Sequence, residues 1–456
     1  MAAINQVMLS EAVHNNRFSA EFFDPQYVFK PSASSTWLPI GRILKKCEYG
    51  ISISMNTEGD GYPIFRMNEI ENCFALRPEK FAAIPNFIFQ QYKLNENDVL
   101  FNRTNSFEFV GRTGIVKDQT DCTFASYLIR LVPDSNIILP EYLTIYLNTP
   151  FGIGQIKRRA MRSINQANVS GAEVKKILIP IASVAEQQKV ANDLNDAFSA
   201  ARKGEQLYKD AQHLLESELG LDKLKFKKPV GYTARFSTVG LSDAFNAGRI
   251  DAQCFSPNAI FYESWLHDHN QCDYLNHLLE AKIKGRQQEE TEKGSIDYCS
   301  IKHISGREMT GASKCMPSPD TPLATQNNLL LAITGATIGK IGIVKRYKQL
   351  AFSGDLLCLK ISPGIDPHYL LVVLDHTIGQ VQFNRWITGS TNGHLAPRDV
   401  GRVLVPRFKK SIETRIAGLV EESLRKRLES EKLLDQAKAR VEQLIEEAVE
   451  ARRRSV

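Results

Sequence analysis

The feature that most constrains this chain is an internal repeat, in which one series of short segments occurs twice in the same order. RFSAEFFDP (17–25) and RIDAQCFSP (249–257) share Arg, Ala, Phe and Pro at the same offsets. Further matched pairs follow downstream, namely IFRMNEI (64–70) with YCSIKHI (298–304), NDVLFNRT (97–104) with NNLLLAIT (327–334), VGRTGIVK (110–117) with IGKIGIVK (338–345), PEYL (140–143) with PHYL (367–370), and KKILIP (175–180) with GRVLVP (401–406). Because order, spacing and chemistry agree from residue 17 to residue 180, the chain is predicted to contain a duplicated domain.

Each copy has the pattern of a mixed domain with a sheet-rich core. Short alternating or β-branched runs are separated by turns that contain Gly and Asn, which is typical of strands. The segments beginning PEYL and PHYL are predicted to form short helices, so the fold class is α+β. Gly111 and Gly339 occupy the same place in the two copies. We interpret them as turn residues, because glycine tolerates positive φ.

A long helical pattern follows each copy. Apolar or small residues recur every three or four positions, which is a heptad seam. The seam residues are Val190, Leu194, Ala197, Ala201, Gly204, Tyr208, Ala211 and Leu215 after the first copy, and Ile416, Val420, Leu424, Leu434, Ala437, Val441, Leu444 and Ala448 after the second. Each helix could pack on its own domain as a surface helix. The length of both seams instead favours two helices that pack against each other, antiparallel.

The pattern therefore predicts an order of domain, helix, domain, helix. The predicted boundaries are 1–182 for the first domain, 183–229 for a central spacer helix, 230–409 for the second domain and 410–456 for a C-terminal spacer helix. Two similar halves imply an approximate two-fold axis. Such pseudo-symmetry suits a ligand with two-fold geometry, and duplex DNA is a polymer of that kind.

Composition narrows the class of protein. The net charge is +6 and the isoelectric point about 8.7, which permits an anionic partner without requiring one. We expect a cytoplasmic location, because the N-terminus lacks the pattern of an export signal and no apolar run is long enough to cross a membrane. The eight cysteines form no CxxC pair, so neither a zinc site nor a disulfide framework is predicted.

Motifs for catalysis are missing from the sequence. Asn148-Thr149-Pro150-Phe151 is one letter away from the clamp that DNA adenine methyltransferases place around a flipped base, but no FxGxG segment accompanies it. We interpret NTPF as a turn after the PEYL helix. Neither a P-loop GxxxxGK[ST] nor an HExxH motif is present. We therefore expect a chain without catalytic or metal-binding residues.

Two parts of the repeat carry a resemblance to a known family. The pattern R-[FI]-[SD]-A-x-x-F-x-P and the stretch SINQANVSGAEVKKILIPIASVAEQQKVANDL (163–194) resemble the entry and exit of a target-recognition domain. The second copy, GSTNGHLAPRDVGRVLVPRFKKSIETRIAGL (389–419), follows the same plan but has Glu413-Thr414 in place of Glu186-Gln187. In this order and duplication, the chain resembles the specificity subunit of type I restriction-modification enzymes.

The resemblance implies two target-recognition domains that bind a bipartite site in double-stranded DNA, with the paired helices as a coiled-coil spacer. It also implies docking of two DNA adenine methyltransferase subunits, and of restriction subunits where these exist. No cofactor is expected on this chain, since AdoMet and ATP with Mg²⁺ would be bound by those partners. The alternatives are the recognition part of a related methyltransferase or phage-defence complex, and a tandem protein-interaction scaffold that does not bind DNA.

Candidate DNA-contacting residues follow from chemistry. Arg, Lys, Asn, Gln, Ser and Thr on loops read base edges, and Lys and Arg also bind phosphates. Taken singly, each could equally be a solvated surface residue, but the loops recur at matching places in both copies. The candidates are Arg103, Thr104, Asn105, Arg112, Lys157, Arg158, Arg159, Arg162, Ser163, Asn165 and Gln166 in the first copy, and Lys284, Arg286, Thr334, Lys340, Arg385, Thr388, Ser390, Asn392 and His394 in the second.

Overall fold

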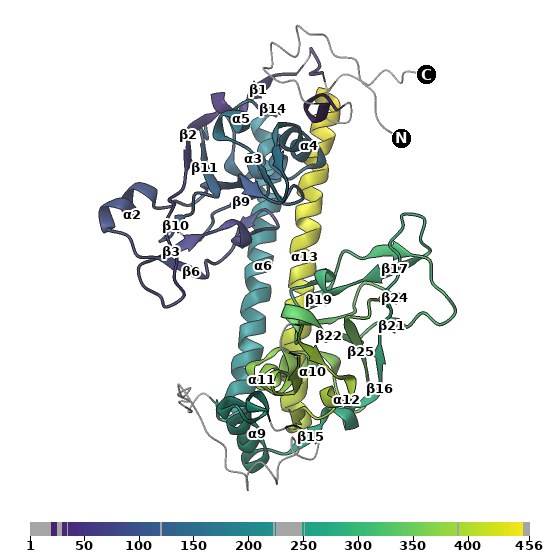
Figure 1. Cartoon of the computed structure of the whole chain (residues 1–456). Helices are drawn as coiled ribbons and strands as arrows, with labels where there is room; N and C mark the ends of the chain where they lie inside the picture. Colours follow the sequence, from purple (N-terminus) through teal and green to yellow (C-terminus); the bar gives the residue numbers. More distant parts are fainter. Residues whose placement is uncertain are drawn as a thin grey trace. The chain divides into compact units, whose positions relative to one another are not determined.

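A computed structural model of the chain describes residues 20–24, 30–33, 35–118, 121–221, 224, 249, 251–389 and 392–449. The chain divides into two compact units. Unit 1 consists of Met1–Arg202 together with Arg427–Val456, and unit 2 is the continuous segment Lys203–Lys426. Figure 1 labels the helices and many of the strands of both units.

Each unit contains a six-stranded sheet, and the strand order is the same in both. In unit 1 the order is β2 (Leu44–Tyr49), β11 (Leu128–Pro133), β7 (Val99–Asn102), β9 (Thr113–Ile115), β5 (Phe74–Ala75) and β4 (Ile70–Glu71). In unit 2 it is β16 (Leu279–Lys284), β25 (Leu356–Ile361), β22 (Leu329–Ala332), β23 (Ile341–Ile343), β19 (Glu308–Met309) and β18 (Ile304–Ser305). The parallel contact also recurs, between β5 and β9 and between β19 and β23.

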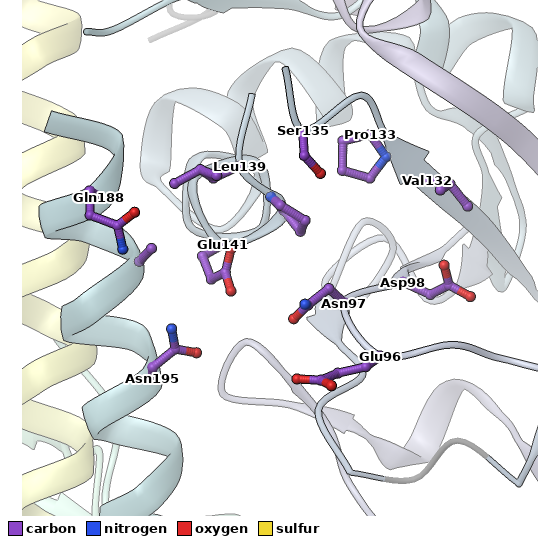
Figure 2. A pocket seen from close by; sticks show the side chains of 12 residues that line it. Glu96, Asn97, Asp98, Val132, Pro133, Ser135, Leu139, Glu141, Gln188 and Asn195 are labelled. Atoms are coloured by element: carbon purple, nitrogen blue, oxygen red, sulfur yellow. The ribbon is translucent and has the colours of Figure 1, made fainter. Parts of the chain in front are cut away.

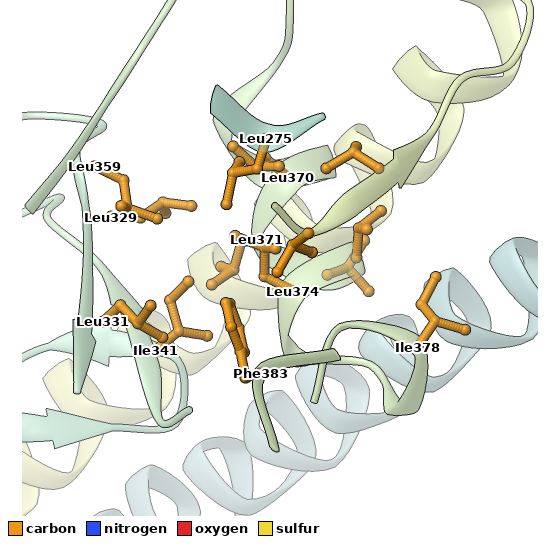
Figure 3. Close-up of a cluster of buried hydrophobic side chains, with 14 of the residues drawn as sticks. Leu275, Leu329, Leu331, Ile341, Leu359, Leu370, Leu371, Leu374, Ile378 and Phe383 are labelled. Carbon is orange, nitrogen blue, oxygen red and sulfur yellow. The ribbon is translucent and has the colours of Figure 1, made fainter. Parts of the chain in front are cut away.

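The central strands are almost entirely buried because both faces of the sheet are covered. Successive side chains of a strand point to opposite faces. Val99 and Phe101 accordingly belong to the hydrophobic cluster shared with the helices of unit 1, whereas Leu100 belongs to a cluster on the other face. In unit 2, Leu329 and Leu331 likewise meet Leu371, Leu374 and Phe383 of the helices (Figure 3).

A smaller sheet covers the second face. In unit 1 it contains β10 (Thr123–Phe124), β3 (Tyr62–Phe65) and β6 (Lys80–Ala82). In unit 2 it contains β20 (Ser313–Cys315), β17 (Ile296–Cys299), β24 (Gln349–Phe352) and β21 (Leu323–Thr325). Between β6 and β7 unit 1 has the helix α2 (Asn86–Tyr92), which is the main departure from the shared pattern.

Two short helices pack on the large sheet of each unit, α3 (Pro140–Leu147) and α4 (Pro150–Arg159) in unit 1 and α10 (Pro367–Asp375) and α11 (Thr377–Trp386) in unit 2. The predicted glycine turns lie against them. Gly111 and Gly339 have φ of 94° and 92°, in the region that favours glycine. A Cβ at Gly111 would approach Ile156 of α4 to 2.5 Å, and one at Gly339 would approach Gln380 of α11 to 2.4 Å. The two glycines are therefore required for both turn shape and helix packing.

The remaining short elements also occur in equivalent pairs. They are the 3-10 helices η1 (Ala20–Phe23) and η6 (Ala252–Phe255), η3 (Ile40–Arg42) and η7 (Leu275–Leu278), and η4 (Met67–Glu69) and η8 (Ile301–His303), the antiparallel strand pairs β1 (Trp37–Pro39) with β14 (Leu178–Pro180) and β15 (Cys272–Tyr274) with β28 (Leu404–Pro406), and the helices α5 (Gly171–Lys175) and α12 (Pro397–Val400). Unit 2 adds α9 (Pro257–His269) and the 3-10 helix η9 (Gly335–Thr337).

The two long helices are α6 (Val184–Leu219) and α13 (Lys410–Ala448). The Ser183 hydroxyl accepts a hydrogen bond from the Glu186 amide at the start of α6, as the capping pattern predicts. Gly220, with φ of 69°, follows its last residue, which is a common way for a helix to end. The helix thus stops short of residue 229.

Both units use parts of both long helices in their cores. Val190 and Leu194 of α6 share one hydrophobic cluster of unit 1 with Leu434, Ala437 and Val441 of α13. In unit 2 the shared cluster contains Tyr208 and Leu215 of α6 and Ile416 and Val420 of α13. Of the residues that the sequence assigned to helix packing, all are buried except Ala201 and Leu444, which are half-buried.

Candidate nucleic-acid interface

Loops that are far apart in the sequence meet beside a β-hairpin in each unit. In unit 1 the first hairpin, residues 161–168, consists of β12 (Met161–Ser163) and β13 (Gln166–Asn168), and β13 also pairs with β8 (Thr104–Asn105). In unit 2 the second hairpin, residues 387–395, consists of β26 (Ile387–Thr388) and β27 (His394–Leu395), and Thr334 bridges to His394. The same pairing brings Thr104 beside Asn168 and Thr334 beside His394.

A network of side chains supports the first hairpin where β13 pairs with β8. The Arg103 guanidinium donates to Asn168 Oδ1 at 3.0 Å, and Asn168 Nδ2 donates to Thr104 Oγ1 at 2.8 Å. The Arg103 guanidinium also lies 4.9 Å from the centre of the Tyr49 ring. The Asn105 side chain accepts a hydrogen bond from the Ser106 amide. Arg103, Thr104 and Asn105 therefore hold the base of the hairpin, and only Thr104 among them is fully buried.

The polar side chains of the first hairpin itself face solvent. Arg162, Ser163, Asn165 and Gln166 are all exposed. The Arg162 guanidinium stacks on the Phe107 ring, 3.4 Å from its centre, and the Ser163 hydroxyl donates to the Gln166 carbonyl at 3.1 Å. These contacts orient the hairpin while leaving its amides at the surface, as base recognition requires.

Each unit presents an exposed cation directly after the positive-φ glycine that lies against α4 or α11. Arg112 follows Gly111, and Lys340 follows Gly339. The Arg112 guanidinium lies 4.1 Å from the centre of the Phe109 ring. Because the two cations occupy equivalent turns beside equivalent helices, a contact to a phosphate from one unit would have a counterpart in the other.

Lys157 is half-buried and is used within unit 1. Its Nζ donates to the carbonyls of Phe107, Glu108 (2.9 Å) and Val110 (3.1 Å). Burial lowers the pKa of this amine to about 8. Lys157 thus fixes the 107–110 turn, and through Phe107 it supports the position of Arg162.

Arg158 and Arg385 occupy equivalent positions and have the same structural contact. Arg158 Nε donates to the Phe22 carbonyl of η1, and Arg385 Nε donates to the Cys254 carbonyl of η6 at 2.8 Å. Arg385 also forms an ion pair with Glu263. The repeated motifs at 17–25 and 249–257 therefore supply, in their described parts, a 3-10 helix that an arginine ties to the domain. Arg159 has a comparable use, donating to the Lys176 carbonyl and pairing with Glu173.

The other candidates of unit 2 are mostly at the surface. Lys284 is exposed at the end of β16, where it is the counterpart of Tyr49 in the strand register, and Arg286 is exposed just after this strand. Thr388 and Asn392 are exposed on the second hairpin, and the Thr388 hydroxyl donates to the His394 carbonyl at 3.1 Å. His394 and Thr334 are half-buried, and Thr334 donates to Asp355 at 2.5 Å. Ser390 lies outside the described residues.

Residues that the sequence did not single out complete the surface. Asn168 joins Arg103 to Thr104, and Phe107 supports Arg162. Ile164, at the tip of the first hairpin, is 99% exposed, and Met161 is 64% exposed. The sequence signal that could have identified Ile164 is its place within a basic and polar run, where a core residue is not expected.

A pocket of about 370 Å³ in unit 1 has a different character (Figure 2). Its lining includes the carboxylates of Glu96, Asp98 and Glu141, and Lys117 pairs with Glu141 at 2.6 Å. Burial raises the pKa of Asp98. This acidic lining is unsuited to phosphate, so we do not include the pocket in the nucleic-acid interface. Gln326, Asn328 and His368 occupy the matching places in unit 2.

Comparison with known proteins adds to this geometry. Residues 43–206 match the family described as the type I restriction modification DNA specificity domain. This segment is similar to a DNA specificity domain. The match ends within α6, so it includes the first part of this long helix.

Individual relatives give the same result. The chain is 28% identical over 205 residues to the EcoKI specificity subunit of Escherichia coli, covering 43% of this chain and 42% of the relative. The putative MjaX specificity subunit of Methanocaldococcus jannaschii is 29% identical over 159 residues, covering 34% and 37%. Each match spans less than half of the relative's length. The expected resemblance to specificity subunits is confirmed.

Among solved structures, the S subunit of a type I restriction-modification system from M. genitalium is 14% identical, with a TM-score of 0.41 and coverage of 92% of this chain and 98% of that one. Among the residues that the structure describes, no group of three His, Cys, Asp or Glu side chains is placed to hold a metal ion. In the same residues, no helix is both long and apolar enough to span a membrane.

Proposed function

We propose that this chain is a DNA-recognition subunit of a type I restriction-modification enzyme and binds a bipartite site in duplex DNA. The observation that carries the proposal is the recurrence of the specificity domain's strand order and hairpin in unit 2, beyond the matched residues. Two domains of one topology, each with its own exposed polar hairpin, are suited to two separate half-sites.

The two surfaces share their support but differ in the residues they expose. Both units have a hairpin bridged to a threonine and a cation after a glycine turn. The exposed residues differ, with Arg162, Ser163, Asn165 and Gln166 in unit 1 against Thr388 and Asn392 in unit 2. Because amides, hydroxyls and guanidinium groups distinguish base pairs by their donor and acceptor patterns, the two half-sites should have different sequences.

The reading surface that we propose excludes four of the original candidates. Arg158, Arg159 and Arg385 hold other parts of their own units, and Lys157 fixes a turn. The proposed contact residues are Arg112, Arg162, Ser163, Asn165 and Gln166 in unit 1, and Lys284, Arg286, Lys340, Thr388 and Asn392 in unit 2. Arg103, Thr104, Asn105, Thr334 and His394 would position them.

In this proposal α6 and α13 form an antiparallel coiled coil, and the chain has an approximate two-fold axis. Two contacts between the helices support this direction. Arg440 pairs with Asp193 at 2.9 Å in unit 1, and the Ser423 hydroxyl donates to the Gly204 carbonyl at 2.7 Å in unit 2, so numbers rise along one helix as they fall along the other. The coiled coil would space the half-sites and bind two methyltransferase subunits, with restriction subunits joining them.

The chain itself would be non-catalytic, with AdoMet, ATP and Mg²⁺ bound by its partners. The test begins with the purified full-length chain and selection from random duplex DNA at low salt. We expect two short conserved blocks separated by a gap of fixed length and free sequence. Failure to bind any duplex would favour a protein-interaction scaffold. Methyl transfer from labelled AdoMet by the chain alone would contradict the non-catalytic role.

A further inference from the structure

The tip of the first hairpin carries an aliphatic side chain with no cover. Ile164 is 99% exposed in the turn between β12 and β13, and Met161 on the same hairpin is 64% exposed. Burying an isoleucine is favourable, so leaving it in water sacrifices that gain. An apolar group held at the end of a projecting hairpin is therefore suited to contact with an apolar feature of a ligand.

The surroundings of Ile164 indicate nucleic acid as that ligand. Residues 157–168 contain no acidic residue, and Arg162 is the one arginine among them that is exposed. Ile164 lies between Ser163 and Asn165, both exposed, and Arg162 is held in place by its stacking on Phe107. The apolar tip is thus surrounded by groups that bind phosphates and base edges, whereas protein interfaces are usually depleted in charge at the centre.

The shape of the element selects the groove. A two-stranded β-ribbon fits the major groove of B-DNA, which is about 12 Å wide, but not an undeformed minor groove of about 6 Å. The apolar feature of the major groove is the 5-methyl group of thymine. We propose that Ile164 contacts the 5-methyl group of a thymine in the half-site read by unit 1. This inference rests on the proposed function and adds one base preference to it.

The second hairpin provides an internal contrast. Residues 388–394 read TGSTNGH and contain no aliphatic residue larger than glycine. The sequence of the second hairpin therefore offers no aliphatic counterpart of Ile164, and the proposed methyl contact belongs to one half-site only. This asymmetry separates the proposed contact from a general preference of both domains for A·T pairs.

The experiment uses the full-length chain and the duplex obtained by selection with the wild-type protein. Each thymine is replaced in turn by deoxyuridine, which removes the 5-methyl group and leaves base pairing and the minor groove unchanged. We expect wild-type affinity to fall about fourfold at one position, the effect of losing one buried methyl group. Ile164→Ala should weaken binding to the thymine duplex by at least as much and be insensitive to uridine at that position.

Val184→Ala is the matched control, because Val184 is another exposed aliphatic residue of unit 1, 76% accessible, at the start of α6. It should bind as wild type does and retain the uridine effect. The inference is overturned if the wild type binds its site but no uridine substitution weakens it, or if Ile164→Ala retains full sensitivity. A wild-type chain that binds no duplex would instead overturn the proposed function.

Discussion

Replacing Arg385 by alanine should destabilise unit 2 rather than remove a contact to DNA. The residue is only 4% exposed, and its guanidinium pairs with Glu263 of α9 and donates to the Cys254 carbonyl of η6. Without it, one carboxylate and one carbonyl lose their partner. Breaking a buried ion pair on one side costs about 3–5 kcal/mol. Because the Glu263 side chain is 19% exposed, the lower end of about 3 kcal/mol applies.

For a unit of this size, each kcal/mol lowers the midpoint of thermal unfolding by roughly 2–4 °C, so Arg385→Ala should lower that of unit 2 by roughly 6–12 °C. Differential scanning calorimetry of the full-length chain measures this shift. Arg398→Ala is the control, because the Arg398 side chain is 78% exposed. In this variant the unfolding midpoint of unit 2 should move little. The double variant Arg385→Met/Glu263→Met should recover much of the loss, since it leaves no charge unpaired. An unchanged midpoint combined with weaker DNA binding would refute the structural role.

Three further predictions concern charge and length. Arg112→Ala and Lys340→Ala should each weaken binding to all duplexes and lower the salt dependence of the affinity by about one counterion, as titrations at several salt concentrations would reveal; unchanged salt dependence would exclude a phosphate contact. Since the pKa of Lys157 is lowered to about 8, the unfolded chain binds more protons at this residue between about pH 8 and pH 10, so the contribution of Lys157 to the free energy of unfolding of unit 1 should rise over that range. Cys73 and Cys122, whose pKa values burial raises to about 11, act in the opposite direction in both proteins, so urea denaturation should detect the rise as a growing difference between the wild type and Lys157→Met. If α6 and α13 space the half-sites, one heptad inserted into each helix at the unit boundary adds about 10 Å and should lengthen the preferred gap by about three base pairs, which repeated DNA selection would measure.

The duplicated strand order could be anticipated because its signals are local. Gly111 and Gly339 lie in matched GxxG patterns, and their positive φ follows from a turn that the neighbouring residues already suggest. The heptad seams likewise identify the buried faces of α6 and α13, since a helix repeats its faces at a fixed period. Their periodicity does not identify which part of each helix belongs to which unit.

The role of each arginine could not be anticipated, because it depends on distant partners. Arg158 and Arg162 lie in one basic run, yet Arg158 reaches η1, 136 residues away, while Arg162 remains at the surface on Phe107. The same applies to Thr104 and Asn168, which meet only because β8 pairs with β13. Local pattern identifies where the basic loops are, and tertiary packing decides which of their side chains remain free for a ligand.

The division of the chain has a consequence for its synthesis. Unit 2 is one continuous segment, whereas unit 1 needs both the first 202 residues and the last part of α13. Leu434, Ala437 and Val441 cover the same core as Val190 and Leu194. At roughly 5–20 residues per second, the ribosome makes the missing part of unit 1 tens of seconds after its first part. The N-terminal unit, although made first, is therefore the one that finishes folding last.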